Sequence, residues 1–274
     1  MNSLLTRSIT GVLFISVVLF SILWSPYAQT IVFSGFAFMG LLEFYKLFKT
    51  HPIVNLSRKI GLFFGMFIFT ILVGWSLNWF PLLSLLIIFP LFFTLLLAEL
   101  WRKKEQPLLN IAVMTFGILY TVIPFWLTID LNLRETGENF MPLIIGMYLL
   151  IWSNDTFAYL FGSSFGKTKL FERISPKKTW EGTLGGVIST VLVGLLIGLY
   201  INEGNILFWV ISAGIIAPCA IFGDLLESLF KRSMDVKDTG RILPGHGGIL
   251  DRFDAALFAA PFFYCWALFY NHLF

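Results

Sequence analysis

Long apolar runs alternate with short polar breaks along the whole chain. A helix that crosses a bilayer needs about 20 consecutive, mainly apolar residues, and nine runs approach that length. The pattern predicts an all-α, polytopic integral membrane protein with about nine transmembrane helices. The predicted spans are roughly residues 8–25, 29–47, 60–77, 81–100, 109–129, 141–162, 183–201, 206–230 and 254–273, with ends placed to within about four residues.

The composition excludes the other broad classes. Of the 274 residues, 57% are hydrophobic and 13% are charged, whereas soluble domains contain roughly 45–50% apolar and about 25% charged residues. A chain this apolar cannot cover a core with polar surface, and it carries too much apolar area to stay disordered. We expect a single membrane domain over residues 1–274, with N-terminal helices in 1–150 and C-terminal helices and loops in 151–274.

The basic residues predict the orientation. Of the 19 lysines and arginines, 17 lie before the first run or in the breaks after the second, fourth, sixth and eighth runs, Lys46 lies at the end of the second run on the same side, and Arg134 is the exception. Basic residues in short loops stay in the cytoplasm, so we expect a cytoplasmic N-terminus and an external C-terminus. The opposite set of breaks is acidic, with Asp130, Glu135, Glu138 and Glu203. We expect the membrane to be a bacterial inner (plasma) membrane.

Acidic residues inside or beside three apolar runs predict a functional site. Asp155 lies in the sixth run, Asp224 and Glu227 lie late in the eighth, and Asp251 and Asp254 open the ninth. A charge at mid-bilayer costs at least about 2.5–3.5 kcal/mol. Residues three apart share a helix face, so two acidic faces are expected at the cytoplasmic ends of neighbouring helices. Mg²⁺ prefers such carboxylates together with substrate phosphates.

A purely structural explanation of these acids stays open. Asp251 fits the first turn of a helix as a cap, and Glu227 fits an i,i+4 ion pair with Lys231. The same explanation is weaker for Asp224, Asp251 and Asp254 taken together.

The two longest polar breaks, roughly 163–182 and 231–253, are both predicted to be cytoplasmic. The second contains several basic residues, His246 and four glycines, whose backbone amides can approach an anion closely. The first contains the sequence S-P-K-K-T-W-E-G from Ser175, whose paired lysines are suited to phosphate. Residues 162–168 fall one residue short of a P-loop, and no strand is expected before them, so that interpretation is rejected.

These segments resemble a known family. Residues 228–232 read S-x-x-K-R, residues 237–238 read K-D, and residues 244–254 read P-x-H-G-G-x-x-D-R-x-D. Together with residues 155–162 and 175–182, they resemble the signature of the phosphatidate cytidylyltransferases, also called CDP-diacylglycerol synthases. The detailed resemblance covers about residues 152–254.

The resemblance implies a membrane enzyme of phospholipid biosynthesis. Such an enzyme transfers the cytidylyl group of CTP to phosphatidate, giving CDP-diacylglycerol and pyrophosphate, and requires a divalent metal. We therefore expect Mg²⁺, with a second metal or a monovalent ion left open. The resemblance implies a homodimer, with Asp224 and Asp251 as metal ligands. We expect no nucleic-acid partner.

The resulting site prediction has two parts. The catalytic set consists of Asp224, Asp251, Lys231, Arg232, His246 and Asp254. The substrate-binding set consists of Ser175, Lys177, Lys178, Thr179, Glu181, Lys237, Asp238, Arg252 and Asp155.

Two other functions remain alternatives. A CTP-dependent lipid kinase of the dolichol type would transfer the terminal phosphoryl group instead of the nucleotidyl group. An ion-coupled transporter would also carry acids within the membrane, but these acids are expected at one face, beside basic loops.

Overall fold

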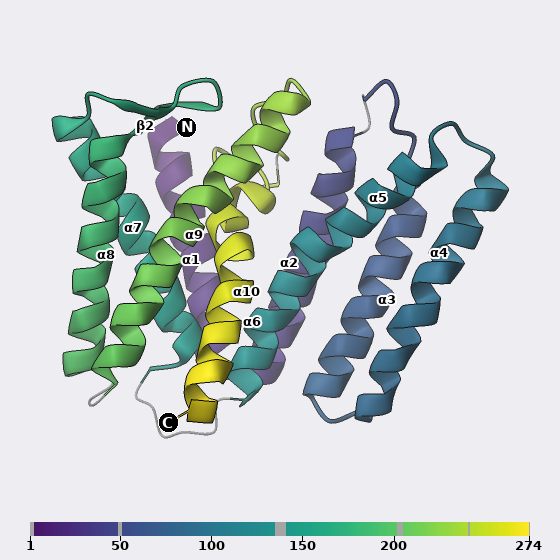
Figure 1. The fold of residues 1–274 in the computed structure, drawn as a ribbon, viewed down its shortest axis with the longest axis horizontal. Coiled ribbons are helices and arrows are strands. Elements are labelled where there is room, and N and C mark those ends of the chain that lie inside the picture. The colour runs from purple at the N-terminus through teal and green to yellow at the C-terminus, as the bar shows by residue number, and fades with distance from the viewer. Residues whose placement is uncertain (1–2, 49–50, 135–140, 202–204, 241, 274) are drawn as a thin grey trace. The chain divides into compact units, whose positions relative to one another are not determined.

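The computed structural model describes residues 3–48, 51–134, 141–201, 205–240 and 242–273, with side-chain surroundings from residue 8 to residue 272 of these. Helices dominate this part of the chain (Figure 1). Their bounds are α1 Ser3–Trp24, α2 Pro26–Leu47, α3 Arg58–Ser76, η2 Leu82–Ile87, α4 Ile88–Arg102, α5 Pro107–Gly117, η3 Ile118–Val122, α6 Ile123–Arg134, α7 Leu143–Phe165, α8 Trp180–Tyr200, α9 Ile206–Ser233 and α10 Leu250–Leu273. The strands β1 Lys169–Phe171 and β2 Ser175–Thr179 form an antiparallel hairpin.

The helices have the length and composition of membrane spans. Within the described ranges, eight helical segments are long and apolar enough to cross a membrane, counting η2 with α4 and α5, η3 and α6 together. In α1, the apolar part that is described, Ser8–Trp24, is shorter than these eight. The helical, polytopic fold predicted from the apolar runs is therefore confirmed.

Helix starts coincide with the polar breaks because the break residues act as caps. The hydroxyl of Ser25 accepts a hydrogen bond from the Ala28 amide (3.1 Å), and Pro26 takes the first helical position of α2. Ser57 caps α3 in the same way, through the Ile60 amide.

One compact unit contains Met1–Leu133 and Ser233–Arg252. Inside it, α2 packs against α3 and against the α5–η3 segment. The hydroxyl of Tyr45 on α2 donates to the carbonyl of Met114 on α5 (2.8 Å). Gly117 allows this close approach, because a Cβ there would lie 2.7 Å from the Tyr45 ring. The π-helical turn η3 follows directly.

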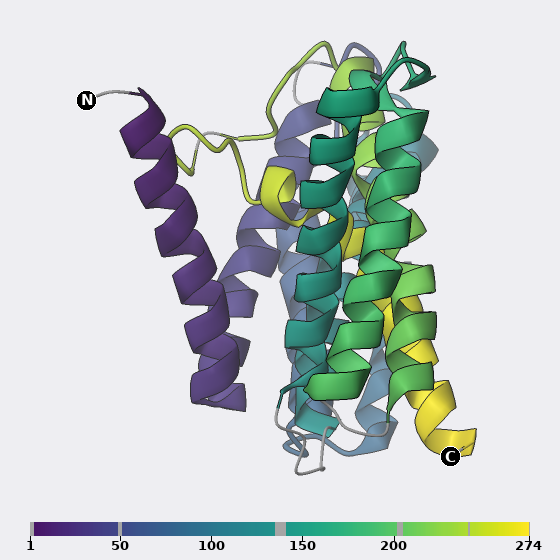
Figure 2. The same ribbon diagram turned by 90° about the vertical axis from the view of Figure 1, so that its left-hand side faces the viewer.

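The second compact unit contains Arg134–Arg232 and Phe253–Phe274. Its α7 and α8 run side by side (Figures 1 and 2) and share the most extensive contact between elements. A Cβ at Gly182 of α8 would lie 2.6 Å from the Ala158 carbonyl and 2.9 Å from the Gly162 Cα, both on α7. Small residues thus bring the two backbones together, as is common between membrane helices.

Several local features differ from the prediction. The hairpin was not expected, and it turns part of the 163–182 break into ordered structure. The predicted span 109–129 extends to Arg134, so Asp130 lies in α6, where Ser76 donates to its carboxylate (2.5 Å). Lys231 and Arg232 belong to the last turn of α9, and α10 begins at Leu250. Polar helix ends carry no apolar signal, so the pattern could not mark them.

Some predictions concern residues that lie outside the described part of the chain. These are Glu135, Glu138 and Glu203 of the acidic breaks. The predicted single membrane domain, divided near residue 150, stays a prediction.

Candidate active site

A cavity of about 340 Å³ with charged residues in its lining opens beside the β1–β2 hairpin of the second unit. Its volume lies in the range of small-molecule sites, which is about 300–1,000 Å³. The lining comes from α7, β2, the start of α8, and α9. It includes Asn154, Asp155, Tyr159, Gly162, Ser163, Lys177, Lys178, Thr179, Thr183 and Asp224.

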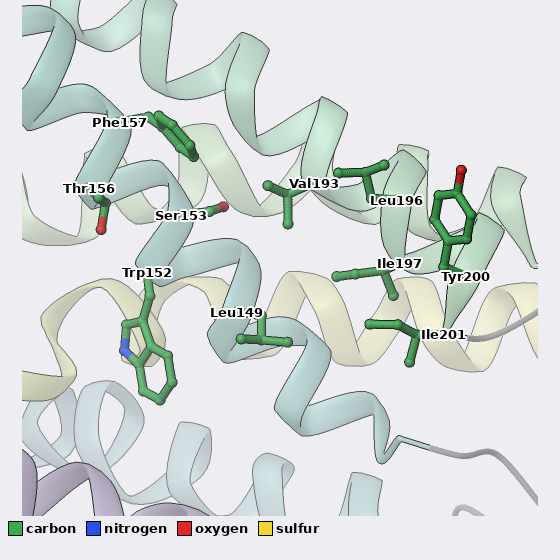
Figure 3. Close-up of a pocket in the computed structure, with 10 residues that line it drawn as sticks. All are labelled: Leu149, Trp152, Ser153, Thr156, Phe157, Val193, Leu196, Ile197, Tyr200 and Ile201. Carbon is green, nitrogen blue, oxygen red and sulfur yellow. The ribbon is translucent and has the colours of Figure 1, made fainter.

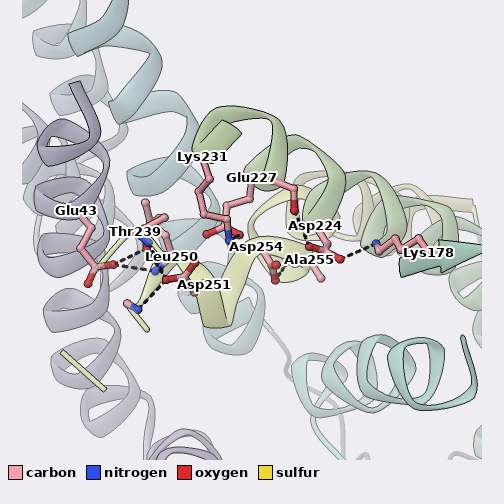
Figure 4. Close-up of polar contacts among 12 residues, drawn as sticks. Glu43, Lys178, Asp224, Glu227, Lys231, Thr239, Leu250, Asp251, Asp254 and Ala255 are labelled. Carbon is pink, nitrogen blue, oxygen red and sulfur yellow. Dashed lines mark hydrogen bonds and ion pairs between the residues drawn. The ribbon is translucent and has the colours of Figure 1, made fainter. Parts of the chain in front are cut away.

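Strand β2 carries the basic side chains of this cavity. The ammonium group of Lys178 lies 2.6 Å from the Asp224 carboxylate (Figure 4). It also donates to the Ile221 carbonyl at 3.4 Å. Lys177 also lines the cavity and is exposed. An acidic and a basic group therefore face the same space, and a bound phosphate would compete with Asp224 for Lys178.

Two predicted site residues hold the hairpin in place. Thr179 caps α8 by accepting from the Gly182 amide (3.2 Å). The Glu181 carboxylate accepts from the amides of Lys167 (3.0 Å) and Thr168 (3.1 Å). Ser175, at the other end of β2, is partly buried. The hairpin is thus fixed at the point where it enters α8.

An acidic cluster lies where α9 and α10 pack in the same unit. Oxygen atoms of Asp224, Glu227 and Asp254 all lie within 4.8 Å of one another. Gly223 allows this packing, because a Cβ there would lie 2.6 Å from the Asp254 carbonyl. Mg²⁺ usually takes one or two carboxylates together with water and substrate phosphates, so the cluster offers oxygen donors of a kind that suits such an ion.

Neighbouring groups on α9 bind two of these acids. Lys231 pairs with Glu227 at 2.6 Å, so the i,i+4 ion pair considered from the sequence is present. The Ser228 hydroxyl contacts Asp224 at 3.4 Å, and Arg232 is exposed at the end of α9.

Asp251 anchors the loop between α9 and α10 within the first unit. One of its oxygens accepts from the Gly248 amide (2.8 Å), the Thr239 amide (2.9 Å) and the Thr239 hydroxyl (2.9 Å) (Figure 4). The side chain is almost fully buried. These three donors lie before α10, so Asp251 anchors the preceding loop through them, and they are not the helix-capping contacts considered from the sequence.

The first unit also contains a buried acid that the sequence interpretation missed. Glu43 of α2 is 1% exposed and accepts from the Leu250 amide at 3.0 Å. The signal was present, because Glu43 is an acid within the predicted span 29–47 and meets the criterion applied to Asp155.

The α9–α10 loop surrounds a second cavity, which is polar and has a volume of about 450 Å³. Its lining includes Lys237, Asp238, His246, Arg252 and the glycines around them. Gly245 and Gly247 have positive φ angles of 80° and 83°, which a residue with a Cβ rarely adopts. His246 packs on α1, where its Nδ1 lies 2.7 Å from the Thr10 hydroxyl.

A third cavity lies on α7 and α8 and is largely apolar (Figure 3). It has a volume of about 530 Å³ and includes Leu149, Trp152 and Phe157. Ser153, Thr156 and Tyr200 supply hydroxyl groups, but no lining residue is charged. It suits an apolar chain and not a phosphate.

The predicted residues thus fall into separate groups. Asp155, Lys177, Lys178, Thr179 and Asp224 share one cavity, and Lys237, Asp238, His246 and Arg252 share another. Asp224 lies in the second unit and Asp251 in the first. Their pairing as metal ligands therefore stays a prediction.

The long apolar helices define a polytopic membrane protein. Its lysine-bearing cavity and its carboxylate cluster are suited to charged ligands. The profile of the Cytidylyltransferase family matches residues 5–270, and the chain belongs to this family. The resemblance stated from the sequence is confirmed.

The curated relatives support the same family assignment. The chain is 39% identical over 174 residues to the phosphatidate cytidylyltransferase of Rickettsia prowazekii (strain Madrid E), covering 60% of this chain and 73% of that protein. It is 39% identical over 186 residues to the phosphatidate cytidylyltransferase of Staphylococcus saprophyticus, covering 67% of this chain and 69% of that protein.

Proposed function

We propose that this protein transfers the cytidylyl group of CTP to phosphatidate, giving CDP-diacylglycerol and pyrophosphate. The observation that carries the proposal is the cavity in which Lys178 meets Asp224, beside the carboxylates of Glu227 and Asp254, in a chain of the cytidylyltransferase family. Lysines suited to phosphate and acids suited to a cation are what two anionic reactants require.

The reaction needs charge neutralisation more than proton transfer. The second pKa of a phosphate monoester is about 6, so phosphatidate is largely a dianion near pH 7. Its phosphate oxygen attacks the α-phosphorus of CTP, a new P–O bond forms, and the bond to the β-phosphate breaks to release pyrophosphate. No general base is required, and positioning of the two anions dominates catalysis.

Lysine and arginine side chains would do this positioning. Lys177 and Lys178 of the hairpin cavity are suited to the CTP phosphates, and Asp155 lines the same space. Lys237 and Arg252 of the loop cavity are suited to a second phosphate. His246 in that cavity is a candidate donor to the leaving pyrophosphate.

The acidic residues would hold Mg²⁺, which would neutralise charge on the triphosphate. Asp224, with Glu227 and Asp254 beside it, offers the donor set. Asp251 remains the second ligand implied by the resemblance.

The membrane arrangement extends the proposal. Counting α1 as a span would give nine spans among the described residues, and the distribution of lysine and arginine supports a cytoplasmic N-terminus and an external C-terminus. CTP would then reach the site from the cytoplasm, and phosphatidate from the bilayer of a bacterial inner membrane. A homodimer stays a prediction.

Pyrophosphate release by the purified protein tests the proposal. We expect release that requires CTP, phosphatidate and Mg²⁺ together, and that falls at least about 100-fold in Asp224→Asn and in Asp251→Asn. Asp130→Asn is the matched control, since Asp130 is also a buried acid of a membrane helix but bonds to Ser76. Full activity in Asp251→Asn would remove Asp251 from the metal site, and wild-type protein without lipid-dependent release would contradict the proposed function.

A further inference from the structure

Glu43 is a buried carboxylate to which the proposed reaction gives no role. We infer that Glu43 is a positioning residue that fixes the loop before α10 and, through Thr239, the carboxylate of Asp251. The inference rests on the proposed function, in which Asp251 is a metal ligand.

The contacts of Glu43 all reach the same segment. Its Oε2 atom accepts from the Leu250 amide at 3.0 Å and from the Thr239 hydroxyl at 3.4 Å (Figure 4). These partners lie 207 and 196 residues further along the chain. The longer contact to Thr239 is the weaker of the two, because the same hydroxyl lies 2.9 Å from Asp251. Thr239 thus lies between two carboxylates, one of which is expected to bind the metal.

Two glycines show how closely the loop surrounds Glu43. A Cβ at Gly240 or at Gly248 would collide with the Glu43 carboxylate. Gly248 also donates its amide to Asp251 at 2.8 Å. The loop backbone is therefore packed against one carboxylate while it donates to the other.

The surroundings of Glu43 differ from those of a simple buried ion pair. Glu99 of α4 is equally buried, but Arg102 and Asn110 bind its carboxylate. No described lysine or arginine pairs with Glu43, and no partner binds its Oε1 atom. A buried carboxylate without a cation costs free energy. We therefore expect Glu43 to hold the loop in place, and not only to stabilise the packing of the helices.

Glu43→Gln is the sharpest test because the side chain keeps its shape. The amide oxygen can replace Oε2 but carries no charge, so the Leu250 amide and the Thr239 hydroxyl lose a charge-assisted acceptor and the loop should loosen around Asp251. Residues that orient metal ligands typically change metal affinity about 10–100-fold when they are replaced. We expect the half-saturating Mg²⁺ concentration for pyrophosphate release to rise by about that factor, with a much smaller change in KM for CTP.

A second measurement does not depend on activity. Hydrogen–deuterium exchange of the purified protein should show faster exchange in peptides covering residues 238–251 of Glu43→Gln, without Mg²⁺ or substrate. Thr239→Val should act in the same direction, and adding it to Glu43→Gln should give less than the sum of the two effects, because both break one connection. Thr239→Val also keeps the inference testable if Glu43→Gln does not fold.

The control and the outcomes separate the two proposals. Glu99→Gln removes a comparable buried acid and should leave both Mg²⁺ dependence and exchange in 238–251 unchanged. An unchanged Mg²⁺ requirement and unchanged exchange in Glu43→Gln, or in Thr239→Val if Glu43→Gln does not fold, would overturn the role of Glu43 while wild-type activity stands. Absence of activity in the wild-type protein would instead overturn the proposed function, and the exchange result would still decide whether Glu43 holds the loop.

Discussion

The two lysines of strand β2 differ in their contacts. Lys178 is paired with Asp224, whereas its neighbour Lys177 is exposed and lines the same cavity. We expect Lys178→Met to raise KM for CTP at least about tenfold, because a phosphate contact is lost and Asp224 loses its cation. KM for phosphatidate should change much less. Lys177→Met serves as the comparison, with a smaller effect, and steady-state kinetics in mixed micelles provide the measurement. An unchanged CTP dependence in Lys178→Met would make the hairpin purely structural.

At the residue scale the sequence could indicate single candidate residues but not how the structure groups them. Asp224 and Asp254 could be identified because a carboxylate within or beside an apolar run needs a partner. The position of the Thr239 hydroxyl between Glu43 and Asp251 could not be predicted from the sequence, because its contact with Glu43 joins positions 196 residues apart. Glu43 meets the same criterion, because it is a carboxylate within an apolar run, but it was overlooked.

Close packing of α7 against α8 builds the wall of the hairpin cavity. A Cβ at Gly182 would meet two backbone atoms of α7, so Gly182→Ala has to separate the helices. Overpacking of this kind costs about 1–3 kcal/mol, so a lower melting temperature in detergent and weaker CTP binding are expected. Gly214→Ala on α9 is the control, since nothing lies within 4 Å of its Cβ position and Ala favours a helix. Equal melting temperatures for the two variants would show that α7 and α8 adjust freely.

Apolar periodicity predicted the helices but not their polar ends or the hairpin. Residues 169–179 are short, basic and interrupted by Pro176, so no strand alternation marks them. Lys231 and Arg232 continue α9 because basic side chains are favourable near a helix C-terminus, where hydropathy no longer reports helix. The sequence therefore placed the signature residues on a long loop, whereas several of them belong to helix ends.

The charge asymmetry of the whole chain predicts which breaks face the cytoplasm. Trp79 and Lys104 are exposed in breaks of the two opposite sets. With Cys219 and Cys265 replaced by serine, an impermeant maleimide should label Trp79→Cys in intact cells and Lys104→Cys only after the membrane is opened. The reverse pattern would invert the orientation and place the CTP site outside the cell.

The position of the label transferred from CTP tests the proposed reaction most directly. Purified protein would be incubated with phosphatidate, Mg²⁺ and CTP labelled at either the α- or the γ-phosphate. We predict that α-label enters the lipid in a one-to-one ratio with pyrophosphate carrying the γ-label. Entry of γ-label into the lipid, with the α-label left in CDP, would contradict cytidylyl transfer and identify a lipid kinase.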